Sequence, residues 1–198
     1  MDFNNFITRA FISIFFLSIY LLIANISFNY IFYLILILYL FIFIEVYIYF
    51  KKFKLIIFLY IFISIIFVFN NNFSNDNLNK FNLMLLTIIS FDIFSYLIGN
   101  IFGRTKFLKF ISPNKTLEGL IGGIIFSFLI TLLYAYYFNF KINYNLCFII
   151  LLFVLSALIG DIIESYFKRK NNLKNSSNFL PGHGGFFDRF DSFIPAII

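Results

Sequence analysis

The sequence IFYLILILYLFIFIEVYIY, residues 31–49, decides the fold, because its 19 residues include a single charged side chain, that of Glu45. A helix of about 20 apolar residues, rising 1.5 Å per residue, crosses the roughly 30 Å hydrocarbon core of a bilayer. The chain contains similar runs along its whole length, so we predict an all-α polytopic bundle of about six transmembrane helices. The expected spans are residues 10–27, 31–49, 55–69, 81–98, 120–138 and 146–167.

The composition excludes a soluble globular protein. Hydrophobic residues make up 62% of the chain and charged residues 12%, against roughly 45–50% and 25% in soluble domains. The lone cysteine, Cys147, excludes an intramolecular disulfide, and a single thiol without neighbouring Cys or His residues argues against a thiolate metal site. The net charge of +6 lies in short loops between apolar runs, which favours anionic lipid headgroups or phosphorylated substrates over nucleic acid.

The basic residues predict the orientation of the spans. With six crossings, every Lys and Arg except Lys80 and Lys141 falls on the same side of the membrane as the N-terminus. Loops rich in Lys and Arg stay in the cytoplasm. We therefore expect a multi-pass protein of the inner (plasma) membrane with a cytoplasmic N-terminus and a retained first span.

The sequence suggests a division into two regions. Residues 1–80 would form N-terminal transmembrane helices, and residues 81–198 a catalytic transmembrane region with two cytoplasmic motif loops. The residues between Arg189 and Ile198 are too few for a seventh span, so we expect a truncated C-terminal segment.

Buried acids are the first candidates for function, because an ionised group in hydrocarbon is unfavourable unless it is paired or lines a polar cavity. Asp92 and Asp161 each lie six residues before the cytoplasmic end of a run, about 9 Å inside it. Asp161, Ser165 and Lys168 share one helix face. The alternative is an ion pair between Glu164 and Lys168, with Asp161 in a polar seam. A further acid, Glu45, is close to basic residues, and we expect it to reach the interface.

The loop after the last run reads PGHGGFFDRFDS, residues 181–192, and follows the cations Lys168, Arg169 and Lys174. Glycines let backbone N–H groups approach an anion, and the cations suit a triphosphate. Asp188 and Asp191, three residues apart, could hold a cation that phosphates share. The alternative is a solvated turn.

The loop after the fourth run contains SPNKTLEG, residues 112–119. Lys115 and Thr116 are reminiscent of a phosphate-binding loop, but the spaced glycines of a Walker A motif are absent. By itself this stretch predicts a helix start with Thr116 as the N-cap, and its cations could equally be anchors on the cytoplasmic side.

Together these motifs resemble the CDP-diacylglycerol synthase (phosphatidate cytidylyltransferase) family over about residues 91–195. The family signature is a Ser-x-x-Lys-Arg run, a Lys-Asp pair, and Pro-Gly-His-Gly-Gly followed by Asp-Arg and Asp. Asn175 stands where the family has the Asp of the pair. The matching residues are Ser165, Lys168, Arg169, Lys174, Pro181, Gly182, His183, Gly184, Gly185, Asp188, Arg189 and Asp191, and, in a second stretch, Asp92, Gly99, Gly103, Ser112, Pro113, Lys115, Thr116, Glu118 and Gly119, with Gly160 and Asp161 between them.

The resemblance implies a nucleotidyltransferase of phospholipid biosynthesis. In its reaction, a phosphate oxygen of phosphatidate attacks the α-phosphorus of CTP, which releases pyrophosphate and forms CDP-diacylglycerol. The implied cofactor is Mg²⁺. The implied partners are CTP, phosphatidate and membrane lipid, with no nucleic acid, and a homodimer is left open.

The resemblance also assigns roles to residues. Asp161, Lys168 and Asp188 would be catalytic, and Asp161 and Asp188 would hold Mg²⁺ with Asp191 as an alternate ligand. The substrate-binding residues would be Asp92, Lys115, Thr116, Ser165, Arg169, Lys174, His183, Gly184, Gly185 and Arg189.

Two other functions remain open from the sequence. A related CTP-dependent membrane enzyme could act on another lipid phosphate or on a polyprenol. An ion-coupled transporter could use Asp92 and Asp161 as a relay, but it would leave the Gly-His-Gly-Gly loop unexplained.

Overall fold

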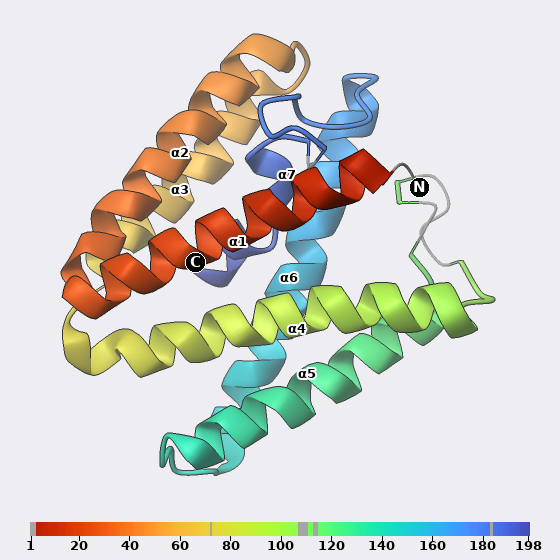
Figure 1. Cartoon of the computed structure of the whole chain (residues 1–198). Coiled ribbons are helices and arrows are strands. Elements are labelled where there is room, and N and C mark those ends of the chain that lie inside the picture. Colours follow the sequence, from red (N-terminus) through yellow and green to blue (C-terminus); the bar gives the residue numbers. More distant parts are fainter. Residues whose placement is uncertain (1–2, 72, 107–110, 113–114, 183) are drawn as a thin grey trace. The chain divides into compact units, whose positions relative to one another are not determined.

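The computed structural model describes residues 3–71, 73–106, 111–112, 115–182 and 184–198, with side chains from Phe11 onward. Its described residues form helices and no strands, as the sequence predicts; the extended contacts among them are two isolated bridges. The elements in Figure 1 are α1 (Phe3–Ile26), α2 (Asn29–Tyr49), α3 (Lys54–Asn70), the 3-10 turn η1 (Asn75–Asn77), α4 (Leu78–Phe102), α5 (Leu117–Tyr137), α6 (Tyr144–Lys170), α7 (Phe187–Phe190) and α8 (Phe193–Ala196).

Several helices meet the length and apolarity that a membrane crossing requires. Among the described residues there are four such segments: Asn29–Tyr49, Asn75–Phe102, Leu117–Tyr137 and Tyr144–Lys170. The apolar stretches Phe11–Ile26 and Lys54–Asn70 are shorter. An all-helical chain with four candidate membrane-spanning helices among its described residues is therefore confirmed, and the count of six crossings and their orientation stay predictions.

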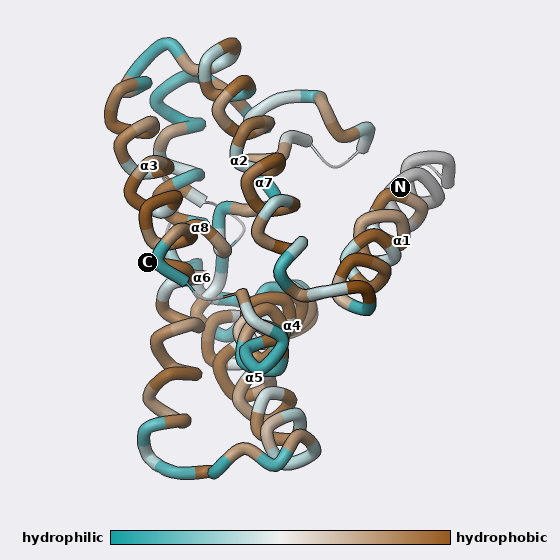
Figure 2. Tube along the Cα trace, turned by 90° about the vertical axis from the view of Figure 1, so that its left-hand side faces the viewer, coloured by the Kyte–Doolittle hydropathy of each residue, from teal (hydrophilic) through white to brown (hydrophobic). Residues whose placement is uncertain are grey.

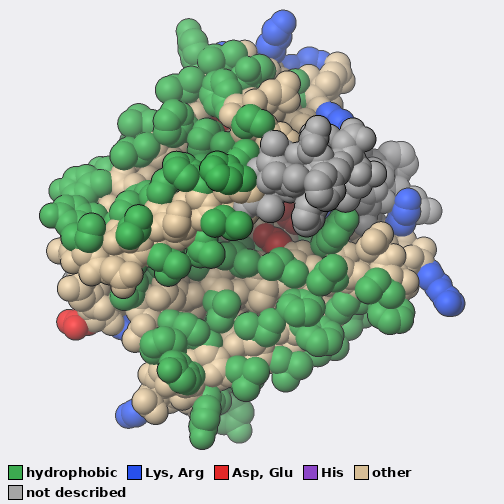
Figure 3. Space-filling view, in the orientation of Figure 1, with side chains coloured by type: hydrophobic (Ala, Val, Ile, Leu, Met, Phe, Trp, Pro, Cys, Tyr) green, Lys and Arg blue, Asp and Glu red, His purple; other side chains and the backbone are tan. Residues whose placement is uncertain are grey.

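The helix surfaces are apolar, as expected where lipid is the solvent. Leu55 and Ile101 expose 71% and 68% of their surface. Figure 2 shows mainly brown, hydrophobic helices, with teal concentrated in the connections between them. Figure 3 shows one face covered largely by hydrophobic side chains, with Lys and Arg at its margin.

The chain folds into two compact units. The first unit comprises Met1–Leu78, Phe167–Phe190 and Ile197–Ile198, and the second comprises Asn79–Tyr166 and Asp191–Ala196. Packing defines these units, so the division of the sequence at residue 80 stays a prediction. The two motif regions are described below within their own units.

In the first unit, α2 and α3 pack along each other. Their buried residues follow the helical repeat: Ile31, Ile35, Tyr39, Ile42, Glu45 and Val46 in α2, and Ile57, Ile61, Ser64 and Val68 in α3. The hydroxyls of Tyr39 and Ser64 form a buried hydrogen bond between the two helices. A buried polar contact of this kind fixes the register of two otherwise apolar surfaces.

In the second unit, glycines allow α4 and α5 to approach closely. A Cβ on Gly119 would lie 2.5 Å from the carbonyl oxygen of Ser95, so a larger residue would separate the helices. Further along, Thr87 and Thr131 form a hydrogen bond of 3.1 Å across the same interface. The close approach fixes the end of α4 against the start of α5, where the first motif loop begins.

Candidate active site

The second motif loop begins where α6 ends. Asn172 has a left-handed backbone conformation with φ 57. The N–H of Leu173 donates to the carbonyl of Lys168 at 2.9 Å, and the N–H of Asn172 donates to the carbonyl of Arg169 at 3.1 Å. This is a Schellman ending, and it leaves the basic residues in the last helical turn, where they complement the negative end of the helix dipole.

The glycine-rich part of this loop is a tight turn in the first unit. The N–H of Leu180 donates to the carbonyl of Gly184 at 2.8 Å, and the N–H of Gly184 donates back at 3.1 Å. Gly184 has φ +89, which strains any residue with a side chain. The glycine is therefore needed to close the turn.

Asp188 organises the loop around its carboxylate. Its Oδ2 accepts the N–H groups of Ser176 at 2.9 Å and Gly185 at 2.8 Å. Its Oδ1 accepts the ammonium of Lys168 at 2.7 Å, and the two side chains are only 7% and 14% exposed. The carboxylate thus ties both arms of the loop to the end of α6.

The backbone amides of the loop are engaged within the protein. Gly185 donates to Asp188, and the next two amides, of Phe186 and Phe187, donate to the side chain of Glu45. From the sequence we expected amides of the glycine loop to face an anionic ligand; for these three amides the anions are protein carboxylates. At these three described positions, side-chain cations rather than amides would attract a polyphosphate.

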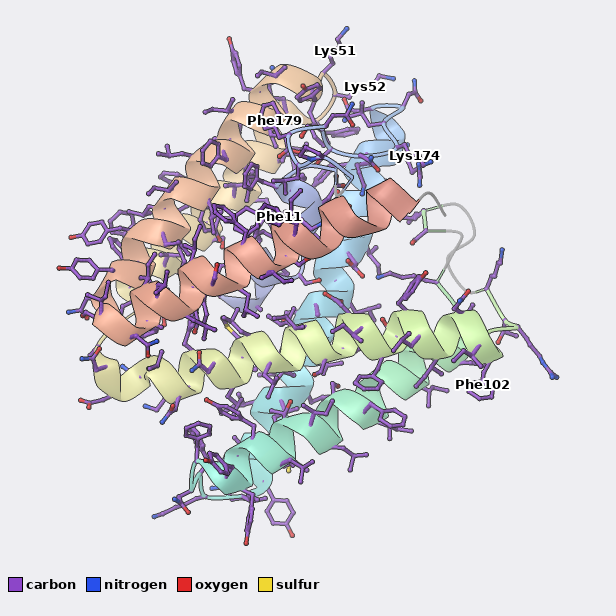
Figure 4. All side chains as sticks on the ribbon, in the orientation of Figure 1. Phe11, Lys51, Lys52, Phe102, Lys174 and Phe179 are labelled. Atoms are coloured by element: carbon purple, nitrogen blue, oxygen red, sulfur yellow. The ribbon has the colours of Figure 1, made fainter. Side chains whose placement is uncertain are left out.

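Three basic side chains of the second motif loop are exposed in the first unit. They belong to Arg169, Lys174 and Arg189. Figure 4 shows Lys174 at the same end of this unit as Lys51 and Lys52, which belong to the loop between α2 and α3. Exposed positive charge beside a loop attracts a triphosphate, which is strongly negative.

The second unit holds Asp161 with a cation of its own. The ammonium of Lys115 lies 2.5 Å from Oδ2 of Asp161, with both side chains partly exposed, at 22% and 27%. Lys115 precedes α5, and Asp161 belongs to α6, so the first motif loop reaches this partly exposed acid. Both residues were predicted from the sequence as site residues, but their ion pair was not predicted.

Asp191 is buried beside Asp161 in the same unit. The pKa of the Asp191 carboxyl is raised well above its usual value, first by burial and then by the charge and hydrogen bond of Asp161, with further contributions from Glu164 and Asp92. The backbone explains the close approach: a Cβ on Gly160 would lie 2.1 Å from the carbonyl oxygen of Asp191. Gly160 therefore lets the chain after α7 lie against α6.

This pair of carboxyls fits a magnesium ion. Mg²⁺ prefers oxygen ligands and is usually bound by one or two carboxylates together with substrate phosphates. In the part of the chain that the structure describes, no three His, Cys, Asp or Glu side chains converge on one point. Asp161 and Asp191 together offer two carboxyls, within the one or two that such a site uses.

The loop that carries Lys115 is fixed at both ends. Thr116 is the N-cap of α5, with its hydroxyl accepting the N–H of Gly119 at 3.1 Å, as the sequence predicts. The carboxylate of Glu118 accepts the backbone N–H groups of Arg104 and Thr105, each at 3.1 Å. The hydroxyl of Thr116 is thus engaged in the helix start, and Lys115 projects from an anchored position.

The remaining predicted residues are distributed over both units. Asp92 and Ser165 are partly buried in α4 and α6, in the second unit. His183 lies outside the described residues. Asn175, the departure from the family signature, is exposed, and its Cβ would be 3.4 Å from a Cβ on Gly184.

The prediction for Glu45 is wrong, and the role of Asn171 was not predicted. Glu45 does not reach the interface; it is fully buried, with 0% exposure, and accepts the amides of Phe186 at 2.8 Å and Phe187 at 3.2 Å. An acid alone in an apolar run was a signal of function, but its partners come from a distant segment. Asn171 carries no sequence signal, since asparagine after a helix is common.

Comparisons with known proteins identify the family of this chain. The sequence model of the Cytidylyltransferase family matches residues 1–198. The chain is 44% identical to a phosphatidate cytidylyltransferase of Staphylococcus aureus (strain COL) over 104 residues, which are 52% of this chain and 40% of that protein. The corresponding protein of Staphylococcus haemolyticus (strain JCSC1435) is 40% identical over 104 residues, with the same coverage. The match thus spans less than half the length of these curated relatives.

Proposed function

Since the chain belongs to the cytidylyltransferase family, we propose that it transfers a cytidylyl group from CTP to phosphatidate, forming CDP-diacylglycerol and pyrophosphate. The relatives carry the name of this activity. The observation that carries the proposal is the loop closed by Asp188 and Lys168. An ion relay requires ionisable groups along a path and no such loop, whereas a triphosphate site requires a loop that holds cations in place.

The residues act by neutralising charge and by positioning. Transfer between phosphates needs little covalent help and depends on in-line geometry and on compensation of negative charge. Arg169, Lys174 and Arg189 are exposed around the loop and would attract CTP. Lys168, held by Asp188 at 2.7 Å, would exchange part of that contact for the phosphates. Lys115 would hold the lipid phosphate or the leaving group beside Asp161.

Mg²⁺ is the proposed cofactor, with Asp161 and Asp191 as its protein ligands. When bound, it would polarise the phosphate that is attacked and neutralise charge on the leaving group. The sequence resemblance adds Asp188 as a further ligand. The ammonium of Lys115, 2.5 Å from Oδ2 of Asp161, would compensate the charge of this partly exposed carboxylate before substrates arrive.

The proposed membrane arrangement places CTP and lipid on one side. Six crossings with a cytoplasmic N-terminus, in the inner membrane, are supported by the distribution of Lys and Arg in the loops. Both motif loops would then face the cytoplasm, which contains CTP. Phosphatidate would arrive laterally from the same leaflet.

The direct test is turnover by the purified protein in mixed micelles with phosphatidate, Mg²⁺ and CTP labelled at the α-phosphate. We expect the label to enter the chloroform-soluble fraction only when phosphatidate is present. A polyprenyl phosphate in its place would reveal the related enzyme class. Ion flux in vesicles without lipid labelling would instead favour the transporter and contradict the proposal.

A matched pair of variants sharpens this test. Lys168→Met removes a cation of the loop, and we expect it to lower turnover about 100-fold, as the loss of a phosphate-compensating group does. Lys80→Met removes a cation outside both motif loops and should retain turnover near that of the wild type. Equal turnover of the two variants would remove Lys168 from the mechanism.

A further inference from the structure

We infer that Glu45, which lies outside the family motifs, is a positioning residue that shapes the CTP-binding loop. The inference rests on the proposed function and concerns the first unit alone. Glu45 belongs to α2, more than a hundred residues along the chain from the loop that it holds. It is fully buried.

Glu45 and Asp188 together bind three successive backbone amides. Gly185 donates to Asp188 at 2.8 Å, and Phe186 and Phe187 donate to Oε2 of Glu45 at 2.8 and 3.2 Å. Consecutive N–H groups that converge in this way form an anion site. Here two carboxylates of the protein, those of Asp188 and Glu45, accept these N–H groups, so the turn keeps its shape without a bound substrate.

The glycine at position 185 is a consequence of this contact. A Cβ on Gly185 would lie 1.6 Å from Oε1 of Glu45 and 2.3 Å from the hydroxyl oxygen of Ser176. No side chain can occupy that space while Glu45 is in place. The glycine therefore serves the close approach of the α2 carboxylate, a role that the glycine-rich motif alone does not reveal.

A second anchor lies at the other end of the loop. The side-chain oxygen of Asn171 accepts the N–H groups of Lys51 at 2.8 Å and Lys52 at 2.6 Å, and its amide donates to the carbonyl of Lys52 at 3.1 Å. The segment that directly follows α2 thus holds the start of the loop, while Glu45 holds its end. Both ends are fixed to one helix and its extension.

Aromatic contacts reinforce the same attachment. The ring of Phe186 stacks on Phe41 of α2 with centroids 4.9 Å apart, and Phe187 meets Phe50 edge-on at 5.9 Å. These contacts supply apolar burial, which is not directional. The orientation of the loop backbone comes instead from the two hydrogen bonds to Glu45, which fix the direction of the amides.

The consequence is specific to CTP. Without the carboxylate, two buried amides lose their acceptor and the turn relaxes, so Lys168 and the loop cations no longer match the triphosphate. Glu45 touches no substrate on this account and acts through the loop. The KM for CTP should therefore rise, while the KM for phosphatidate stays within about twofold, since the two hydrogen bonds orient only the nucleotide loop.

The experiment compares Glu45→Ala, Glu45→Gln and the matched control Tyr39→Phe by steady-state kinetics. Tyr39 lies on α2, like Glu45. Tyr39→Phe removes its buried hydrogen bond to Ser64 of α3, away from the loop. Glu45→Ala should raise the KM for CTP about tenfold or more, the expected effect of losing charge-assisted hydrogen bonds. Glu45→Gln should recover part of the loss, because its amide oxygen can accept the same N–H groups. Tyr39→Phe should leave the KM for CTP unchanged.

A merely structural role gives a different result. It would lower kcat by reducing the amount of folded enzyme, equally in Glu45→Ala and Tyr39→Phe, with an unchanged KM for CTP, and would overturn the inference. Hydrogen exchange separates this failure from failure of the proposed function. Even if the wild type does not turn over CTP, the segment 185–188 should exchange faster in Glu45→Ala than in Tyr39→Phe, and equal exchange would refute the positioning role.

Discussion

A missing side chain at Gly160 allows two carboxyls to meet. A Cβ there would lie 2.1 Å from the carbonyl oxygen of Asp191, a distance that backbone atoms cannot accommodate. The sequence identified Gly160 and Asp161 as a motif, but spacing alone could not tell that the glycine serves Asp191, because the contact joins α6 to a segment after a long loop.

We therefore predict that Gly160→Ala lowers turnover about tenfold or more, by moving Asp191 away from Asp161. Ser156→Ala, on the same helix, is the control; its hydroxyl bonds only to carbonyls of its own helix. Both variants should elute as a single species in detergent. Wild-type turnover by Gly160→Ala would show that the contact of the two carboxyls has no role.

The shared metal ion is tested by combining substitutions. Asp161→Asn and Asp188→Asn should each reduce turnover by orders of magnitude if both residues serve the same Mg²⁺, and the double variant should be scarcely worse than either. The assay is turnover across a range of Mg²⁺ concentrations. If the reductions in turnover of the two single variants multiply in the double variant, Asp188 does not share the metal ion. Its role is then to hold the loop, where it accepts the N–H groups of Ser176 and Gly185.

Helices are the level at which the sequence is most informative. The apolar run 120–138 corresponds to α5 (Leu117–Tyr137), and 146–167 to α6 (Tyr144–Lys170). The helices start earlier or end later than the runs, because hydropathy registers the lipid-facing part and misses polar first and last turns. The short helices α7 and α8 were not predicted, since four residues carry no periodic signal.

The start of α5 allows a test at this scale. Thr116→Ala removes the cap that accepts the N–H of Gly119 at 3.1 Å, and should lower the free energy of unfolding by about 1 kcal/mol. Thr116→Ser should retain most of the stability, because its hydroxyl can also accept. Denaturant unfolding in micelles measures both, and an unchanged midpoint for Thr116→Ala would contradict the cap.

At the scale of the whole molecule, the sequence does not show which helices pack together. A helix that is apolar on every side has no periodic stripe to mark its buried face, as in α2, whose only charged residue is Glu45. The packing of α2 with the distant loop 168–190 in one unit could not be predicted, because neither segment carries a sequence pattern that identifies its packing partner.

The orientation in the membrane is tested by labelling in a chain whose native thiol is removed by Cys147→Ser. Asn175→Cys, in the predicted cytoplasmic loop, should resist an impermeant thiol reagent in intact cells and react after permeabilisation. Tyr144→Cys should react from outside, since Tyr144 is 94% exposed and lies in the predicted external loop. The reverse pattern would invert the topology and exclude CTP from the motif loops.

The central claim is that this chain transfers a cytidylyl group, and a dual-label assay tests it most directly. Purified protein would be given phosphatidate, Mg²⁺ and CTP labelled either at the α-phosphate or at the γ-phosphate. We predict that the α-label enters the lipid, while the γ-label is released as pyrophosphate in equal amount. Entry of the γ-label into lipid, which marks a kinase, or the absence of lipid labelling in a monodisperse preparation would contradict the account.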